Sequence, residues 1–370
     1  MKLALAFGPY CCPVGFDFHN LWTDGARALS GSDLGLLRIA QEAVKLGHEV
    51  HVYCEPKPGC TLPAEWETLR LHPFAERFTQ EFDGFVSWNE CNPLIGTRAR
   101  LRVCSLQVND ILGSPVATDL WLSPSEWHRA RLSPQHPAPW EVVPDGADVE
   151  PFDMLAANGF AKIPGRCIWT SSPDRGLHWL LQEWPMIRRA VPHASLRVFY
   201  PLDGWLARMA SVTDGPVDIM EQKARAAFIE RRRPELERMG VEFCGGVSRV
   251  EITKEIAAAV CLPYSCDPVR PTEGFSCSVM ESAAARSCPI ITAVDAFPEI
   301  YGGTLPMVDM PLSKNAPVFR DLVIRALTDS AFRDEVNGKA RALAERFTWR
   351  KAAERMCEVL EKHLAGRVAP

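Results

Sequence analysis

The chain has 370 residues, of which 47% are hydrophobic and 24% charged, and its formal net charge is −5. This composition is typical of a globular protein of about two domains, and it excludes a disordered chain, a collagen, a coiled coil and a disulfide-stapled miniprotein. No apolar stretch approaches the roughly 20 residues of a membrane span, and the first one has no signal-peptide cleavage site, so we expect a cytoplasmic protein.

The first half of the chain alternates short apolar runs with a helical segment. Residues 3–7 form an apolar run that predicts a buried parallel strand, and a loop rich in Gly, Pro and aromatic residues follows to about residue 30. A helix is predicted over 33–46, with Gly47 as its C-terminal stop, and a strand over 50–53. Further strands are predicted over 82–87, 102–106 and 120–123. Such alternation indicates a doubly wound parallel sheet.

Charge is distributed unevenly along the chain. The first 150 residues contain 12 Lys and Arg against 19 Asp and Glu, a net charge of −7, and the remaining residues have a net charge of +2. An acidic first half disfavours duplex nucleic acid and anionic membranes as partners, whereas the second half is compatible with a small anionic ligand. Arg98, Arg100 and Arg102 alternate on one strand face, which favours a charged edge strand over a site for an acceptor phosphate.

A second series of alternating elements begins after residue 160. Strands are predicted over 167–169, 196–199, 241–243, 259–262 and 289–292, and helices over 177–189, 221–239, 248–257, 275–287, 314–328, 330–346 and 349–365. The simplest architecture is α/β, with two Rossmann-like doubly wound domains that face each other across a cleft. We expect an N-terminal domain at 1–155, a second domain at 156–346, and a terminal helix within 347–370 that packs back toward the N-terminal domain.

The strongest chemical signal is the segment from Glu273 to Glu281. Glu273 follows a predicted strand, and Gly274 beside it allows a close backbone approach to a ligand. A helix that begins near Phe275 directs its first amides, at 276–277, toward the preceding loop, where amides and helix dipole suit a pyrophosphate. Glu281 follows within about two helical turns, and a carboxylate there can accept hydrogen bonds from a ribose diol.

This segment resembles the E-x7-E signature of family 4 retaining glycosyltransferases, which have the GT-B fold. Four further motifs of that family have similar segments here, in the same order along nearly the whole chain. They are the glycine-rich loop with the following helix and GH-x-V strand (30–33 and 46–50), the interdomain segment (140–152), the segment around the family lysine (171–181) and the start of the terminal helix (347–349). The resemblance implies a GT-B fold and the transfer of a sugar from a nucleotide-diphosphate sugar.

The resemblance also implies roles for particular residues. The first glutamate of the signature, Glu273, would lie at the transferred sugar, and the second, Glu281, would bind the nucleotide ribose. Arg175 takes the place of a family lysine that neutralises the diphosphate, and its planar guanidinium can grip phosphate. The remaining candidates would hold the donor through backbone amides or the glycine-rich loop: Gly274, Phe275, Ser276, Cys277 and Gly31. Each charged candidate also has a purely structural interpretation as a helix-end or solvated charge.

The sequence departs from the family pattern at two positions. Thr170 stands where the family has a second basic residue, and Arg270 is a candidate substitute for that residue. Asn109 stands where the family often has a histidine, and the adjacent Asp110 is a candidate for contact with the sugar. Both departures favour an alternative function, a non-catalytic protein that binds nucleotide sugars. A second alternative is a GT-B nucleotide-sugar 2-epimerase, which the scarcity of histidine near the motifs disfavours.

No metal ion and no cofactor are expected besides the donor substrate. The nine His and 13 Cys residues form neither H-x3–5-H nor C-x-x-C spacings, and no two aspartates are spaced D-x-D. We therefore expect reduced cysteines and a metal-independent glycosyltransferase of the hexosyltransferase type. Its donor would be a UDP- or GDP-linked sugar and its acceptor a hydroxyl group, with a role in carbohydrate biosynthesis favoured.

Overall fold

The computed structural model describes residues 1–7, 31–55, 59 and 68–367. The predicted loop before residue 31, including Ser30, lies outside the described residues. The described residues form two units: unit 1 contains those up to Gly146 together with those after Arg346, and unit 2 is Ala147–Arg346. This division falls before the predicted boundary at 155/156, because helix α3 (Glu150–Ala157) packs on helix α7 (Arg249–Ala258) of unit 2.

Unit 1 is built on a parallel sheet of seven strands in the order β3-β2-β1-β4-β5-β6-β7. Its strands are β1 (Lys2–Phe7), β2 (Glu49–Cys54), β3 (Arg70–Pro73), β4 (Glu81–Trp88), β5 (Arg98–Ser105), β6 (Leu120–Ser123) and β7 (Trp140–Val142). Parallel strands covered on both faces consist of near-continuous apolar residues, and residues 3–7 are wholly buried. The chain order reverses between β1 and β4, which is where open α/β sheets bind ligands.

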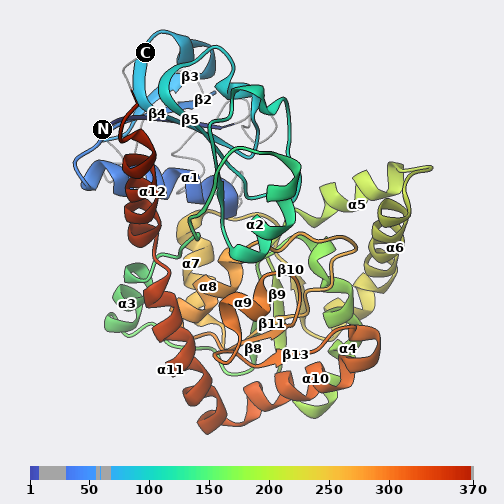
Figure 1. Cartoon of the computed structure of the whole chain (residues 1–370). Helices are drawn as coiled ribbons and strands as arrows, with labels where there is room; N and C mark the ends of the chain where they lie inside the picture. The colour runs from blue at the N-terminus through green and yellow to red at the C-terminus, as the bar shows by residue number, and fades with distance from the viewer. Residues whose placement is uncertain (8–30, 56–58, 60–67, 368–370) are drawn as a thin grey trace. The chain divides into compact units, whose positions relative to one another are not determined.

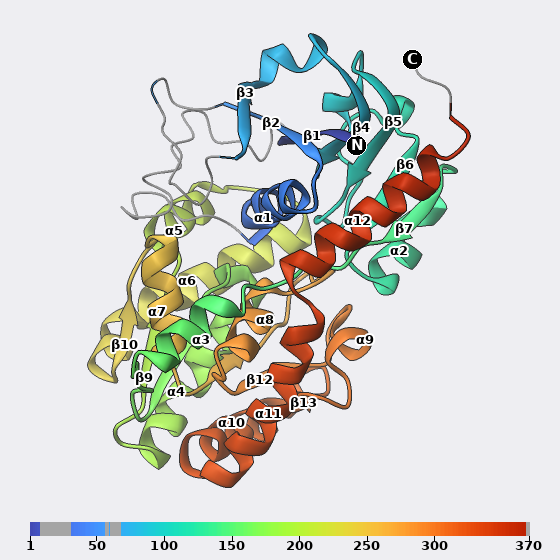
Figure 2. The same cartoon turned by 90° about the vertical axis from the view of Figure 1, so that its left-hand side faces the viewer.

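Helices α1 (Gly31–Lys45) and α12 (Trp349–Leu364) pack against each other in unit 1 (Figures 1 and 2). The Trp349 ring approaches Gly35 so closely that an added Cβ would lie 3.1 Å from it. Thr348 caps α12 by accepting a hydrogen bond from the Lys351 amide at 3.3 Å. The unit contains one further α-helix among the described residues, α2 (Glu126–Leu132). The last helix of the chain therefore covers α1.

Unit 2 contains two three-stranded parallel sheets, β10-β9-β8 and β11-β12-β13, joined by an isolated bridge between Cys167 and Cys261. The strands are β8 (Arg166–Trp169), β9 (Ser195–Val198), β10 (Val241–Phe243), β11 (Leu262–Tyr264), β12 (Pro289–Thr292) and β13 (Met307–Val308). Side by side, the two sheets have the order β10-β9-β8-β11-β12-β13. When the strands are numbered within the unit, this is the Rossmann order 3-2-1-4-5-6, and the chain order reverses between β8 and β11.

Eight further helices of unit 2 connect these strands or follow them, and α3 precedes them (Figure 1). They are α4 (Leu177–Ala190), α5 (Leu202–Ser211), α6 (Val217–Arg238), α7, α8 (Cys277–Ala284), α9 (Phe297–Tyr301), α10 (Leu312–Thr328) and α11 (Ser330–Arg346). Within the described part of the chain, none of the helices is long and apolar enough to cross a membrane.

Several predicted elements differ from the structure. The strand predicted over 259–262 lies at β11, and the helix predicted over 275–287 is the shorter α8. The sequence does not predict β3, β7, β13, α2, α3, α5 or α9. The prediction of an edge strand at the alternating arginines is wrong, because β5 pairs with both β4 and β6. Its arginines instead pair with carboxylates of unit 1, Arg100 with Asp83 and Arg102 with Asp119, each at 3.1 Å.

Candidate functional site

The switch point of unit 2 is the place between β8 and β11 where the strand order reverses. The segments that follow these two strands meet there. Tyr264, the last residue of β11, donates a hydrogen bond from its hydroxyl to Ser171 Oγ at 2.9 Å. After β8 the chain forms a short 3-10 helix, η7 (Pro173–Arg175), and then Gly176, whose φ of 101° lies in the left-handed region. A Cβ on Gly176 would lie 2.1 Å from the Ser265 carbonyl oxygen, so only glycine fits. This close approach places the end of η7 beside the loop after β11.

Arg175 and Glu273 form an ion pair at this point. Arg175 Nε lies 2.6 Å from Glu273 Oε1, and its Nη1 lies 2.6 Å from Asp174 Oδ2. The Glu273 side chain is 6% exposed, and its backbone amide donates to Asp295 Oδ2 at 3.0 Å. The Tyr264 hydroxyl lies 3.5 Å from the same Glu273 oxygen. The structure thus joins two residues that the sequence named separately.

The charge of one guanidinium and of two other carboxyl groups acts on Glu273. Burial raises the pKa of Glu273 to about 7; Arg175 opposes this increase, and Asp295 and Asp174 add to it. Burial lowers the pKa of Arg175, but the carboxylates of Glu273 and Asp174 outweigh burial and raise it overall. Arg175 therefore stays charged, whereas Glu273 gains or loses a proton near neutral pH. A carboxyl group of this kind can donate a hydrogen bond to a ligand hydroxyl as well as accept one.

Helix α8 begins beside the segment after β8. Ser276 is its N-cap, since its hydroxyl accepts a hydrogen bond from the amide three residues on, at 3.4 Å. The Ser276 amide donates to the Tyr301 hydroxyl at 3.3 Å, which corrects the expectation that this amide is free for a phosphate. In the first turn, Ser278 Oγ donates to the Thr170 carbonyl at 3.2 Å. The positive end of the helix therefore lies against the segment after β8, where it would stabilise an anion.

The remaining candidates of this motif lie in the same stretch. Gly274 is buried in the loop between Glu273 and the cap, and Phe275 and Cys277 are half-buried on either side of Ser276. Their positions agree with a backbone lining for a ligand at the start of α8.

Glu281 forms a buried ion pair that the sequence did not predict. Its Oε1 accepts a hydrogen bond from Nη2 of Arg249, the first residue of α7, and the two side chains are 8% and 11% exposed. Burial lowers the pKa of Arg249, but the charges of Glu281 and Asp148 raise it overall. No described residue forms a hydrogen bond with Glu281 Oε2. The available sequence signal was Ser248, whose side chain caps α7 and so places Arg249 at a helix start.

The two residues considered for the second basic group do not join this cluster. The Arg270 side chain is 63% exposed and lies 3.9 Å from Asp218, and no ion pair links it to Glu273 or Glu281 among the described residues. The Thr170 hydroxyl is buried and has no hydrogen-bond partner. A different arginine, Arg225, contacts the loop after β11, because its Nη1 donates to the Asp267 carbonyl. No sequence motif singles out Arg225.

In the described part of unit 1, the end of β4 and the start of α1 meet at the switch point. At the end of β4, Trp88 Nε1 and Asn89 Nδ2 both donate to Ser32 Oγ, each at 2.9 Å. Gly31, the glycine named from the sequence, precedes Ser32 as the first residue of α1 and is exposed. These contacts fix the start of α1 to the carboxyl end of the sheet.

Asn109 and Asp110 lie beyond the end of β5 in the same unit. Asn109 is 9% exposed, and neither its side-chain oxygen nor its side-chain nitrogen has a hydrogen-bond partner. Asp110 is exposed. A buried amide without partners is costly unless a ligand completes its hydrogen bonds, so Asn109 has the stronger structural signal of the two.

No disulfide links any two of the ten cysteines in the described part of the chain. In those same residues, no three His, Cys, Asp or Glu side chains lie close enough together to hold a metal ion.

Comparison with known proteins gives matches in structure only. No model of a protein family and no curated protein matches the sequence. The structure of AviGT4, a glycosyltransferase involved in avilamycin A biosynthesis, is 18% identical with a TM-score of 0.65, over 99% of both chains. HepE of Anabaena in complex with UDP-glucose is 14% identical with a TM-score of 0.63, over 98% of this chain and 100% of HepE. WaaG, a glycosyltransferase involved in lipopolysaccharide biosynthesis, is 14% identical with a TM-score of 0.61, over 96% of this chain and 99% of WaaG.

These likenesses over nearly the full length show that the chain has the GT-B fold of these glycosyltransferases. They confirm the fold that the sequence resemblance predicted.

Proposed function

We propose that this protein is a retaining glycosyltransferase. It would move a sugar from a UDP- or GDP-linked donor to an acceptor hydroxyl without a metal ion. The observation that supports this function best is the convergence of Arg175, Glu273 and the start of α8 at the switch point of unit 2. The GT-B fold and the UDP-glucose bound in HepE support the donor class.

The departing diphosphate is the group that this cluster would stabilise. Arg175 and the positive end of α8 offset the negative charge that develops on the leaving oxygen, and one such donor typically contributes about 10²–10³ in rate. Glu273, whose pKa is about 7, would meet the sugar hydroxyls and can donate to them while it is protonated. The acceptor hydroxyl would attack from the face that the diphosphate leaves, with a phosphate oxygen taking its proton, so the anomeric configuration is retained.

Glu281 would recognise the nucleoside. Its Oε1 is fixed by Arg249, and Oε2 can accept a hydrogen bond from a ribose hydroxyl. In this proposal Arg249 is a positioning residue, because it acts on the ribose through Glu281.

A second candidate function is nucleotide-sugar binding without transfer. The observation in its favour is the buried Thr170 hydroxyl at the position of the family's second basic residue, since a single arginine then faces the diphosphate. The two functions share the donor site and differ only in turnover.

The first test is a thermal-shift screen of the full chain with nucleotide diphosphates and their sugars in metal-free buffer. A ligand at 100 times its Kd stabilises the folded state by about 2.7 kcal/mol, so one nucleotide class should raise the Tm by a few degrees. Arg175→Ala should abolish this shift. Arg189→Ala, which removes an exposed arginine of α4 in the same unit, should preserve it.

Analysis of the reaction products then distinguishes between the candidate functions. A glycoside product with the donor's anomeric configuration in NMR spectra supports the transferase, and a new sugar isomer without acceptor would indicate the epimerase. Binding without any product on a broad acceptor panel would favour the non-catalytic function. The proposed function fails altogether if no nucleotide raises the Tm.

A further inference from the structure

A pocket of about 420 Å³ lies at the amino-terminal edge of the unit 2 sheet. Gly165 precedes β8, Val260 precedes β11, His193 precedes β9 and Arg286 precedes β12, and all four line it. The candidate donor site is formed by segments that follow β8 and β11, at the opposite edge. The pocket is therefore separate from that site, and its volume is in the range of pockets for small molecules.

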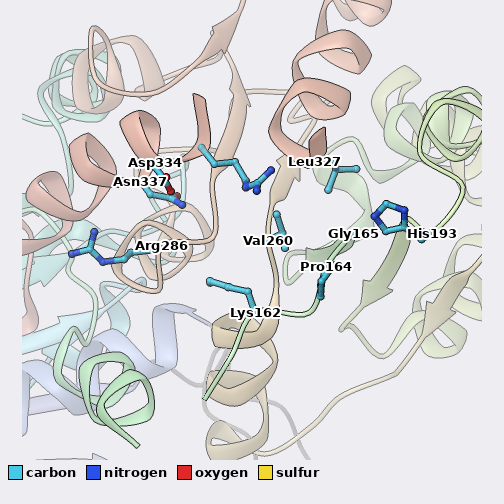
Figure 3. Close-up of a pocket in the computed structure, with 10 residues that line it drawn as sticks. Lys162, Pro164, Gly165, His193, Val260, Arg286, Leu327, Asp334 and Asn337 are labelled. Atoms are coloured by element: carbon cyan, nitrogen blue, oxygen red, sulfur yellow. The ribbon is translucent and has the colours of Figure 1, made fainter. Parts of the chain in front are cut away.

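The lining of this pocket is strongly basic. Lys162, Arg286 and Arg333 contribute three basic side chains, and Asp334 is the only acidic residue in the lining. None of the three cations forms an ion pair with a described residue, whereas Arg175 and Arg249 at the other edge are each paired. Figure 3 shows Lys162, Arg286, Asp334 and Asn337 on one side of the pocket, with Gly165 and His193 on the other.

Lys162 is fixed in place by the end of α8. Its Nζ donates to the Ala285 carbonyl at 2.8 Å and to Ser287 Oγ at 2.7 Å, and an ammonium has three donors, so one N–H remains. Burial and, to a smaller extent, the charge of Arg286 lower the pKa of Lys162 to about 7, and Cys288 opposes them. A bound anion would favour the charged form of such a lysine.

The pocket also contains an unsatisfied hydrogen-bond acceptor. The side-chain oxygen of Asn337 is buried and has no hydrogen-bond partner. A hydroxyl group on a ligand would supply the missing donor, and Asp334 beside it could accept from a second hydroxyl. The basic side chains therefore favour an anionic ligand, and Asn337 and Asp334 favour hydroxyl groups on the same ligand.

We propose that this pocket binds a small phosphate monoester with hydroxyl groups, whose phosphate meets Lys162, Arg286 and Arg333 and whose hydroxyls meet Asn337 and Asp334. Arginine and lysine together suit a phosphate dianion, because guanidinium groups match two phosphate oxygens and an ammonium adds a point charge. The volume exceeds what a bare phosphate would fill, which leaves room for the hydroxylated part.

Calorimetric titration of the full chain with glycerol 3-phosphate at low ionic strength tests the proposal. We expect saturable binding, weaker binding of inorganic phosphate, and no binding of glycerol. Arg286→Asn suits the test because Arg286 has a φ of 56°, which asparagine tolerates. This variant and Arg333→Gln should each weaken binding about tenfold or more, since hydrogen bonds to charged groups contribute about 1.5–3 kcal/mol.

Two controls separate this site from other phosphate-binding surfaces. Arg231→Gln removes an exposed arginine of α6 outside the pocket and should leave the affinity unchanged. Arg175→Ala removes the cation of the candidate donor site and should also leave the affinity for glycerol 3-phosphate unchanged. The titration therefore tests the pocket whether or not the proposed function is correct. The proposal is overturned if glycerol 3-phosphate does not saturate the protein, if inorganic phosphate binds equally well, or if Arg286→Asn and Arg333→Gln bind it like the wild type.

Discussion

The two units share a strand order around their switch points, and among the described residues the ion pairs found at the two points differ. In unit 2 the segments after β8 and β11 hold two ion pairs, Arg175 with Glu273 and Arg249 with Glu281. In unit 1 the segment after β1 lies outside the described residues, and the segment after β4 holds the hydrogen-bonded Asn89 amide and the buried carboxylate of Glu90, which accepts from Asn92 at 2.8 Å. Strand order fixes where a ligand can bind, and the side chains after the strands decide which ligand fits.

This difference has a direct chemical interpretation. A diphosphate requires buried cations, and a buried cation requires a counter-charge when no ligand is present. An acceptor hydroxyl requires only neutral hydrogen-bond partners. In the proposed function unit 2 recognises the donor and unit 1 the acceptor, and three substitutions test this division.

The largest effect is expected for Arg249→Gln. Removal of this guanidinium leaves the Glu281 carboxylate buried and unpaired, so the free energy of unfolding should fall by about 3 kcal/mol and the donor KM should rise. Urea denaturation measures the first effect. Arg233→Gln is the matched control, because Arg233 pairs with the exposed Asp203 and Glu237 and should cost less than about 1 kcal/mol. Equal losses in both variants would show that the Arg249 pair has no special role.

An intermediate effect is expected from the titration of Glu273. A diphosphate favours the protonated carboxyl, so affinity for a nucleotide-diphosphate sugar should fall as the pH rises through about 7, by up to about tenfold between pH 6 and 8. Because the folded pKa is raised, the contribution of this group to stability is present below about pH 4.5 and is lost as the pH rises to about 7. Donor Kd values across this pH range measure the first effect, and Glu273→Gln should flatten them.

Asp145 provides the matched control in unit 1. Burial raises the pKa of this carboxyl to about 7 as well, but it lies outside the candidate donor site. Asp145→Asn should therefore keep the pH dependence of donor affinity. Loss of that dependence in Asp145→Asn, or its persistence in Glu273→Gln, would contradict the assignment to Glu273.

The smallest effect is expected for Asn109→Leu. Leucine has a similar size and no polar atoms, so the free energy of unfolding should rise by about 1 kcal/mol because two buried unpaired atoms are removed. If Asn109 contacts the acceptor, the acceptor KM should rise about fivefold while the donor Kd stays constant. Denaturation and steady-state kinetics measure the two quantities. A less stable variant with normal kinetics would show that Asn109 is only structural.

The fold was predictable where burial is continuous along the sequence. Strands such as β1 and β12 are apolar runs that stand out from their surroundings. The strands β3, β7 and β13 have only two to four residues each, and they become strands because a neighbouring strand supplies hydrogen-bond partners. Such pairing is decided by tertiary structure, so the local pattern does not contain it.

The candidate site was predictable where its residues are neighbours in sequence. The spacing of Glu273 and Glu281 around a helix start was visible. The partners of these residues were not visible, because Arg175 and Arg249 come from distant segments that only the sheet topology brings together. The engagement of the Ser276 amide by Tyr301 is a contact of the same kind.

The place of α12 in the chain determines the order in which the two units can be completed during synthesis. Among the described residues, unit 2 is one continuous segment, whereas unit 1 consists of an earlier part of the chain and the helix α12. All of unit 2 therefore leaves the ribosome before α12, and the side of α1 that receives Trp349 stays uncovered until then. Unit 1 therefore begins before unit 2 in translation and is completed after it.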